Sequence, residues 1–152
     1  MSEPWLAPYL DRMEELSRQF FRYFHGRIEA AGGLSPSQFW LLKVLEKKGP
    51  QTVTDMAVCL GMTAAGVTGL VDRLLRGHLV TRRRDEADRR IVWVELTTQG
   101  HEAIEAARHL RREILGEVFG NFSPAEMEQL VTLYEKASRS MVAAPSDPTV
   151  KE

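Results

Sequence analysis

The sequence predicts a mainly α-helical protein with one small β-hairpin, built as a central lobe with long terminal helices. Three observations predict it. Apolar residues recur at helical spacing along most of the 152 residues, and helix-start and helix-stop signals divide these stretches. Only residues 78–96 alternate like paired strands. With 43% hydrophobic and 27% charged residues, the composition is that of a soluble globular protein able to bury a core.

The first expected helix covers residues 5 to about 30 and ends at Gly32 and Gly33. Leu16 and Tyr23 flank its apolar stripe. The stripe consists of Leu6, Leu10, Met13, Phe20, Phe24 and Ile28. A second helix begins after Ser35, with Gln38 in place to complete a capping box, and runs to about Lys48. The motif Gly49-Pro50 then ends it.

Two short helices follow. Thr52 is the expected N-cap of the first, and Gly61 breaks it. Thr63 caps the second, and Gly77 is expected to end it in the left-handed conformation. The expected inward positions are Val53, Met56, Ala57 and Leu60, then Val67, Leu70, Val71 and Leu74. Two short helices joined by a tight turn form a helix-turn-helix.

The expected strands are the stretches HLVTRRR and RIVWVEL, joined by the polar turn DEAD. A hairpin directly after a helix-turn-helix makes a winged helix, and this hairpin is its wing. Helices are expected from Thr97 to near Gly120 and from Ser123 to about Ala143. We therefore expect an N-terminal dimerisation helix (1–33), a winged helix-turn-helix lobe (34–98), C-terminal dimerisation helices (99–144) and a disordered tail (145–152).

Charge is concentrated locally, although the net charge is only −1. Residues 73–90 hold seven arginines and three acidic residues, whereas residues 101–135 hold three arginines and seven glutamates. Such asymmetry indicates an anionic partner at one surface.

Other classes of function find little support. The N-terminus has neither a basic segment nor a continuous apolar stretch, so we expect a cytoplasmic protein with no membrane partner. The four histidines lack metal-ligand spacing, and no nucleophile–base pair or cofactor fingerprint is present, so we expect no enzyme, metal or cofactor. The single cysteine, Cys59, is expected to be a small core residue.

Two segments, MTAAGVTGLVDRLLRGHLVTR and DEADRRIVWVELTTQG, resemble the MarR family of bacterial transcriptional regulators, the second matching that family's wing signature. The resemblance extends from about residue 5 to residue 143. It implies a homodimer that binds double-stranded DNA at a pseudo-palindromic operator, with the first and last helices interlaced. It also implies a repressor released by a small aromatic or phenolic ligand. Peroxide-sensing members carry a cysteine in the first helix, which this chain lacks.

The expected DNA contacts come from the second helix of the helix-turn-helix and from the wing. They are Thr63, Ala64, Ala65, Gly66, Thr68, Arg73, Arg82, Arg84, Asp88, Arg89 and Arg90. Small side chains let a helix approach base edges, and arginines clamp phosphates. Thr63 could equally serve only as an N-cap. Because Arg82, Arg83 and Arg84 alternate sides, at least one should be an ordinary surface charge.

At the wing tip, Asp88 is spaced to hold the guanidinium of Arg90, and Arg89 or Arg90 is expected to enter a minor groove. The alternative is a solvated charged turn. A different function is a winged-helix protein-interaction module without DNA binding, but such a module has no reason to retain Arg73, Arg89 and Arg90 together. The expected effector-binding residues are Tyr23, His25 and Trp40, each of which could instead belong to the core.

Overall fold

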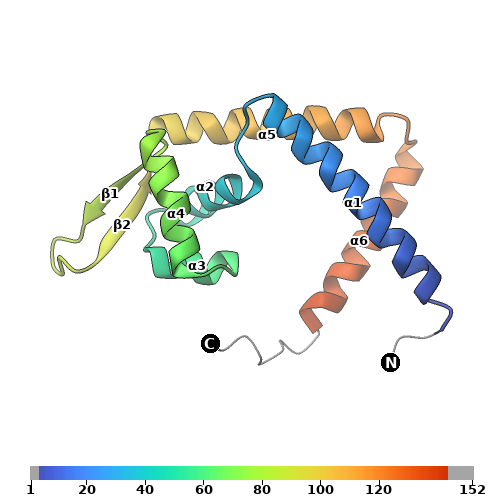
Figure 1. Ribbon diagram of the computed structural model, residues 1–152, viewed down its shortest axis with the longest axis horizontal. Coiled ribbons are helices and arrows are strands. Elements are labelled where there is room, and N and C mark those ends of the chain that lie inside the picture. Colours follow the sequence, from blue (N-terminus) through green and yellow to red (C-terminus); the bar gives the residue numbers. More distant parts are fainter. Residues whose placement is uncertain (1–3, 144–152) are drawn as a thin grey trace. The chain divides into compact units, whose positions relative to one another are not determined.

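The computed structural model describes residues 4–143, so the tail expected over residues 145–152 lies outside the described residues. Within the described chain, six helices and one two-stranded antiparallel sheet confirm the mainly α-helical fold with a hairpin wing (Figure 1). The elements are α1 (Ala7–Ala30), α2 (Pro36–Lys48), α3 (Val53–Leu60), α4 (Ala64–Arg76), β1 (Val80–Arg84), β2 (Val92–Leu96), α5 (Thr98–Phe119) and α6 (Pro124–Ala143).

The chain forms two compact units that divide within α5, after Ile114. The first unit contains α1 to α4, the hairpin and most of α5. The second contains the end of α5 and α6. Within residues 4–143, no single helix is long and apolar enough to cross a membrane; α3 and α4 together, bent by 110° at their junction, meet that test by length and composition only.

The predicted helix starts are confirmed by their hydrogen bonds. Ser35 Oγ accepts from the backbone N–H of Gln38, whose side chain accepts from the N–H of Ser35, so both halves of the capping box are present. The side chains of Thr52 and Thr63 accept from backbone N–H groups three residues later. These bonds satisfy N–H groups that have no partner inside the helix.

The end of α4 differs from the prediction. Gly77 has a φ of −83°, and the left-handed residue is His78, with a φ of 58°. The N–H of His78 donates to the Leu75 carbonyl and the N–H of Leu79 donates to the Leu74 carbonyl. This is a Schellman motif displaced by one residue, in which Gly77 is the C-cap and His78 follows it. Histidine is one of the few residues that adopts this conformation with some frequency.

One apolar core holds the first unit's lobe together and leaves the outer face of α4 exposed. The predicted inward positions of α3 and α4 are all buried or half-buried. The core consists of Phe39, Leu41, Leu42, Leu45, Met56, Ala57, Val67, Leu70, Val71, Leu74, Val80, Val94, Ile104 and Ala107. Complete burial of a leucine or valine side chain contributes roughly 1.5–3 kcal/mol. The core therefore fixes α4 firmly.

The hairpin is attached to this lobe at its base. Strand β1 pairs with β2 in the register Val80↔Leu96 to Arg84↔Val92, and Gln51 exchanges two backbone hydrogen bonds with Val94. Thr97 Oγ1 donates to the His78 carbonyl at 2.7 Å and accepts from the N–H of Gly100 at 3.0 Å. This hydroxyl thus caps the start of α5 and links α5 to the turn that follows α4.

Gly100 allows the closest approach in the lobe. A Cβ at this position would lie 2.1 Å from the Leu79 carbonyl oxygen and 2.7 Å from Leu96 Cδ1. No larger residue fits without movement of the backbone. The segment Leu96-Thr97-x-x-Gly100 therefore supplies a packing group, a helix cap and a close contact that together set the hairpin against α5.

Candidate nucleic-acid interface

The start of α4 presents a surface of small side chains. Ala64, Ala65 and Thr68 are exposed, and the Thr68 hydroxyl donates to the Ala64 carbonyl at 2.9 Å. Thr63 is the N-cap of α4, which is one of the two roles expected for it. Gly66 is half-buried, and a Cβ there would lie 3.2 Å from Thr63 Oγ1. The exposed surface can thus approach a partner closely, because little side-chain bulk covers the backbone.

Arginines lie at the other end of α4 and on the first strand. Arg73 and Arg76 are exposed on the last turn of α4. Asp72 pairs with Arg82 of β1, with Oδ1 and Nη2 2.8 Å apart, so this ion pair links α4 to the wing.

The strand arginines separate into two groups. Arg83 Nε donates to Glu95 Oε1 at 2.6 Å, across the hairpin. Arg82 and Arg84 instead line a hollow of about 450 Å³ together with Val53 and Val92. Because alternate strand residues point to opposite sides, Arg83 is the surface charge that the sequence predicted among these three.

The predicted pair at the wing tip is present. Asp88 Oδ1 accepts from Arg90 Nε and from the backbone N–H of Arg90, and Oδ2 accepts from Nη2, each at 3.0 Å. These bonds lower the pKa of Asp88 and raise that of Arg90. The Arg90 side chain is nevertheless 91% exposed. A carboxylate holds one edge of the guanidinium, while the rest remains open to a partner.

Asp85 organises the wing in a way that the sequence reasoning missed. Its carboxylate accepts from the backbone N–H groups of Ala87 and Asp88 at 2.9 and 3.0 Å and from Trp93 Nε1 at 2.9 Å. The hydrogen bond from Trp93 is the largest cause of its lowered pKa, followed by those from Asp88 and Ala87. Asp85 therefore positions Asp88, which in turn positions Arg90.

The three expected effector residues are all exposed, so the alternative that they are core residues is wrong. Trp40 lines a cavity of about 920 Å³ between α2 and α3. His25 lines a hollow of about 290 Å³ at the junction of α1 and α2, and Pro36 borders both. The Tyr23 hydroxyl accepts from Arg27 Nη1 at 2.8 Å. The structure thus places His25 and Trp40 at adjoining hollows, and Tyr23 lines neither.

Cys59 is not a core residue, which corrects the expectation from sequence. It is exposed at the end of α3, and its Sγ accepts from Lys48 Nζ at 2.9 Å. Helix α3 is short and only Met56 and Ala57 are buried, so its buried face is too narrow to include Cys59. Among residues 4–143, no cluster of three or more His, Cys, Asp or Glu side chains could hold a metal ion.

The fold has counterparts in known proteins. The MarR family model matches residues 32–91, from the turn after α1 to the residue before β2. The transcriptional repressor YetL of Bacillus subtilis is 30% identical over 125 residues, which cover 81% of this chain and 72% of YetL. The chain belongs to the MarR family. It is therefore a DNA-binding transcriptional regulator.

Two solved structures extend the match to nearly the whole fold. A MarR family protein from Bacillus stearothermophilus is 25% identical, with a TM-score of 0.76 over 93% of this chain and 99% of that one. BpsR of Bordetella bronchiseptica, whose DNA binding is regulated by 6-hydroxynicotinic acid, is 28% identical, with a TM-score of 0.65 over 84% of this chain and 98% of its own.

Proposed function

We propose that this MarR family regulator is a repressor that binds a pseudo-palindromic operator as a homodimer and is released by a small aromatic ligand. Two features of the same lobe together support the proposed binding of DNA. Helix α4 presents exposed small residues at its start, and Asp88 holds an otherwise exposed Arg90 at the wing tip.

Helix α4 enters the major groove with its first turns. Ala64 and Ala65 bring the backbone close to base edges, where an alanine methyl can contact a thymine methyl. Thr68 and the cap residue Thr63 supply hydroxyls for phosphate or base contacts, and Gly66 keeps this turn compact. These contacts determine which sequence is recognised.

The arginines fix the position of the lobe on the duplex. Arg73 and Arg76, at the far end of α4, neutralise phosphates, and Arg84 does the same from the hairpin. Arg82, which Asp72 holds against α4, keeps the wing in register with the recognition helix. Arg89 and Arg90 at the tip enter an adjacent minor groove, whose negative potential is strongest where A·T pairs narrow it.

Two sets of exposed apolar residues support a homodimer. In the first unit, the N-terminal part of α1 and the turn before it expose a set of apolar side chains, which are Trp5, Tyr9, Leu10, Met13 and Leu16. In the second unit, α6 exposes Val131, Leu133, Tyr134 and Met141. Contiguous apolar surface of this kind is costly in water and marks an interface. A two-fold dimer buries such faces and presents two lobes to an inverted repeat.

The effector is proposed to occupy the hollows at Trp40 and His25. Both side chains are exposed and aromatic, and the hollows meet at Pro36. Tyr23, whose hydroxyl is bound by Arg27, is proposed to contribute from α1 only once the ligand or the second protomer is in place. Regulation of the relative BpsR by 6-hydroxynicotinic acid supports a small aromatic effector class.

The test uses duplexes selected from a random pool for binding to the protein, each then prepared with A·T-rich and with G·C-rich flanks. Replacement of Arg90 by Ala is expected to weaken binding about tenfold with A·T-rich flanks and less with G·C-rich flanks. Arg83→Ala is the matched control, because Arg83 is occupied by Glu95 on the other side of the strand.

The Asp88→Ala variant distinguishes two roles of Asp88, which are orienting Arg90 and repelling DNA through its negative charge. If Asp88 orients Arg90, its removal weakens binding to the selected site and leaves binding to random duplex unchanged or stronger. An equal gain on both duplexes would show that Asp88 only repels DNA. If the wild-type protein shows no salt-dependent binding to any duplex, the proposed function fails and a protein-interaction module is the better account.

A further inference from the structure

Helix α1 is attached to the rest of the first unit near its C-terminal end. Phe24 and Ile28 are its buried residues, whereas its first half exposes the apolar side chains proposed for the dimer interface. A Cβ on Gly33 would lie 3.0 Å from Ile28 Cγ2 and 3.1 Å from Leu110 Cδ2, so the chain after α1 passes close to α5. The direction in which α1 leaves the winged lobe therefore depends on a few side chains.

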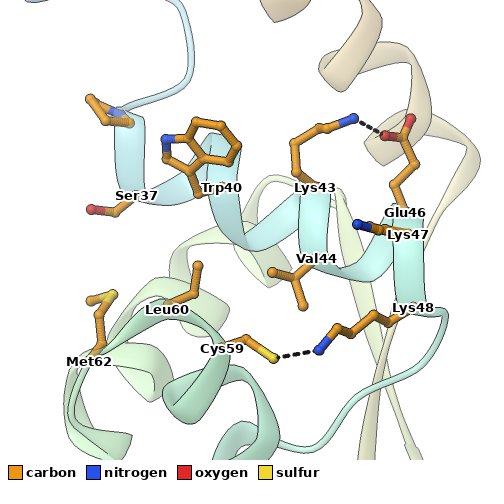
Figure 2. Close-up of a pocket in the computed structure, with 11 residues that line it drawn as sticks. Ser37, Trp40, Lys43, Val44, Glu46, Lys47, Lys48, Cys59, Leu60 and Met62 are labelled. Carbon is orange, nitrogen blue, oxygen red and sulfur yellow. Dashed lines mark hydrogen bonds and ion pairs between the residues drawn. The ribbon is translucent and has the colours of Figure 1, made fainter. Parts of the chain in front are cut away.

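Two arginines one turn apart join α5 to α2. Arg108 Nη2 donates to Glu46 Oε2 at 3.1 Å, and the same carboxylate oxygen lies 2.5 Å from Lys43 Nζ on α2 (Figure 2). One turn further along α5, the guanidinium carbon of Arg111 lies 4.2 Å from the centre of the Phe39 ring, which is buried in the core of the lobe. Helix α2 is thus held on α5 at two successive turns.

Arg111 also reaches α1. Its guanidinium carbon lies 5.3 Å from the centre of the Phe24 ring, so one side chain of α5 contacts both α1 and α2. Among residues 4–143, Arg111 Nη2 is the one buried side-chain nitrogen or oxygen atom that has no hydrogen-bond partner. Burial lowers the pKa of Arg111, but a guanidinium stays charged at neutral pH. Because a cation is attracted to the face of an aromatic ring within about 6 Å, the two rings partly offset the cost of burying this charge.

Stability alone does not explain an arginine at this position. Burial of a cation without an acidic partner costs free energy, and an apolar side chain of similar length would contact the same rings without that cost. A guanidinium is planar and rigid, whereas the thioether chain of a methionine adapts to its surroundings. A planar cation over the rings of Phe24 and Phe39 restricts the relative orientation of the two helices that carry them.

We propose that Arg111 is a positioning residue, which fixes the angle between α1 and the winged lobe through Phe24 and Phe39 and thereby sets the half-site spacing that the dimer accepts. This role rests on the proposed function, because a spacing preference requires two lobes joined as a dimer. One base pair inserted between the half-sites moves one of them by about 3.4 Å and rotates it by about 35°. Lobes that are held firmly are strained when they follow this movement, whereas loosely held lobes follow at a smaller cost in affinity.

The test measures the affinity of the full chain for a selected operator duplex and for the same duplex with one or two base pairs inserted at its centre. The wild-type protein should bind the inserted duplexes at least about tenfold more weakly than the selected one. Arg111→Met should reduce that ratio by about threefold to tenfold, a range that a partly desolvated cation–π contact supports. Arg112→Met is the matched control, because it makes the same charge change at the exposed neighbouring position and should keep the wild-type ratio.

Arg111→Lys keeps the positive charge without the planar group, and it carries the same test if Arg111→Met fails to fold. It should also lose most of the spacing preference, and a wild-type ratio in this variant would overturn the assignment to the planar guanidinium. The proposal is also overturned if Arg111→Met keeps the wild-type ratio, or if it loses affinity equally on all the duplexes, as a weakened fold or a lost DNA contact would cause. A wild-type protein that binds all the duplexes equally would refute the two-fold dimer itself, and with it this role of Arg111.

Discussion

Replacement of Gly100 by Ala tests the junction that sets the wing against α5. The added Cβ would lie 2.1 Å from the Leu79 carbonyl oxygen and 2.7 Å from Leu96 Cδ1. The oxygen belongs to the backbone and accepts from the N–H of Thr97, so it cannot rotate away as a flexible side chain would. The junction must open, with loss of packing at the base of the hairpin.

Two opposing contributions determine the magnitude. Overpacking a well-filled site costs about 1–3 kcal/mol. Alanine is favoured over glycine in a helix by up to about 1 kcal/mol, although less near the first turn, where Gly100 lies. The steric cost should win, because the contact is far shorter than any real Cβ contact. We expect Gly100→Ala to lower the free energy of unfolding by about 2 kcal/mol.

Urea denaturation followed by circular dichroism, at one fixed protein concentration, measures this difference. Gly69→Ala is the matched control, because Gly69 is also helical but a Cβ there meets nothing within 4 Å. It should stabilise the protein by about 0.5–1 kcal/mol. Stability of Gly100→Ala equal to or above that of the wild type would refute the proposed junction.

Three further predictions concern the dimer and the wing. Leu16→Asp places a charge in the exposed apolar face of α1, so this variant should sediment as a monomer. The control variant Val58→Asp, on α3, should remain a dimer. A dimeric Leu16→Asp protein would show that this part of α1 is not in the interface. Asp85→Asn should weaken operator binding, measured by fluorescence anisotropy, more than Glu86→Gln does. Both substitutions remove one negative charge, but only Asp85 accepts a hydrogen bond from Trp93. Equal effects would show that Asp85 acts only as a surface charge. Because the pKa values of Asp85 and Asp88 are lowered in the fold, their stabilising contribution is complete above their ordinary pKa of 3.8 and is lost as pH falls below it. The indole N–H resonance of Trp93 should therefore be unchanged from about pH 8 to about pH 5 and move only under more acidic conditions; movement near neutral pH would contradict this.

Local signals predicted most of the fold. The caps Ser35, Thr52 and Thr63 act within one turn of helix, so their side chains and backbone partners are set by sequence spacing alone. The Asp88–Arg90 pair is similarly local. Inward positions followed from helical periodicity, because a helix beside a single core can bury only one face.

Features that depend on long-range contacts were missed or wrong. Asp85 meets Trp93 only through the register of the hairpin, and Gly100 is required only because Leu79 lies beside it. Cys59 is exposed because only a narrow face of α3 is buried, and the packing of α2 against α3 determines the width of that face. His78 took the left-handed position because the last hydrogen bonds of α4 extend one residue further than the glycine signal suggested.

The most direct test of the central claim is a selection of binding sites from a pool of random duplexes by the full-length protein. A homodimer with α4 in the major groove should enrich inverted repeats whose half-site centres lie about 10 bp apart, with A·T-rich flanks at the positions of the wing. Enriched sites without two-fold symmetry, or no enrichment over the starting pool, would contradict the account.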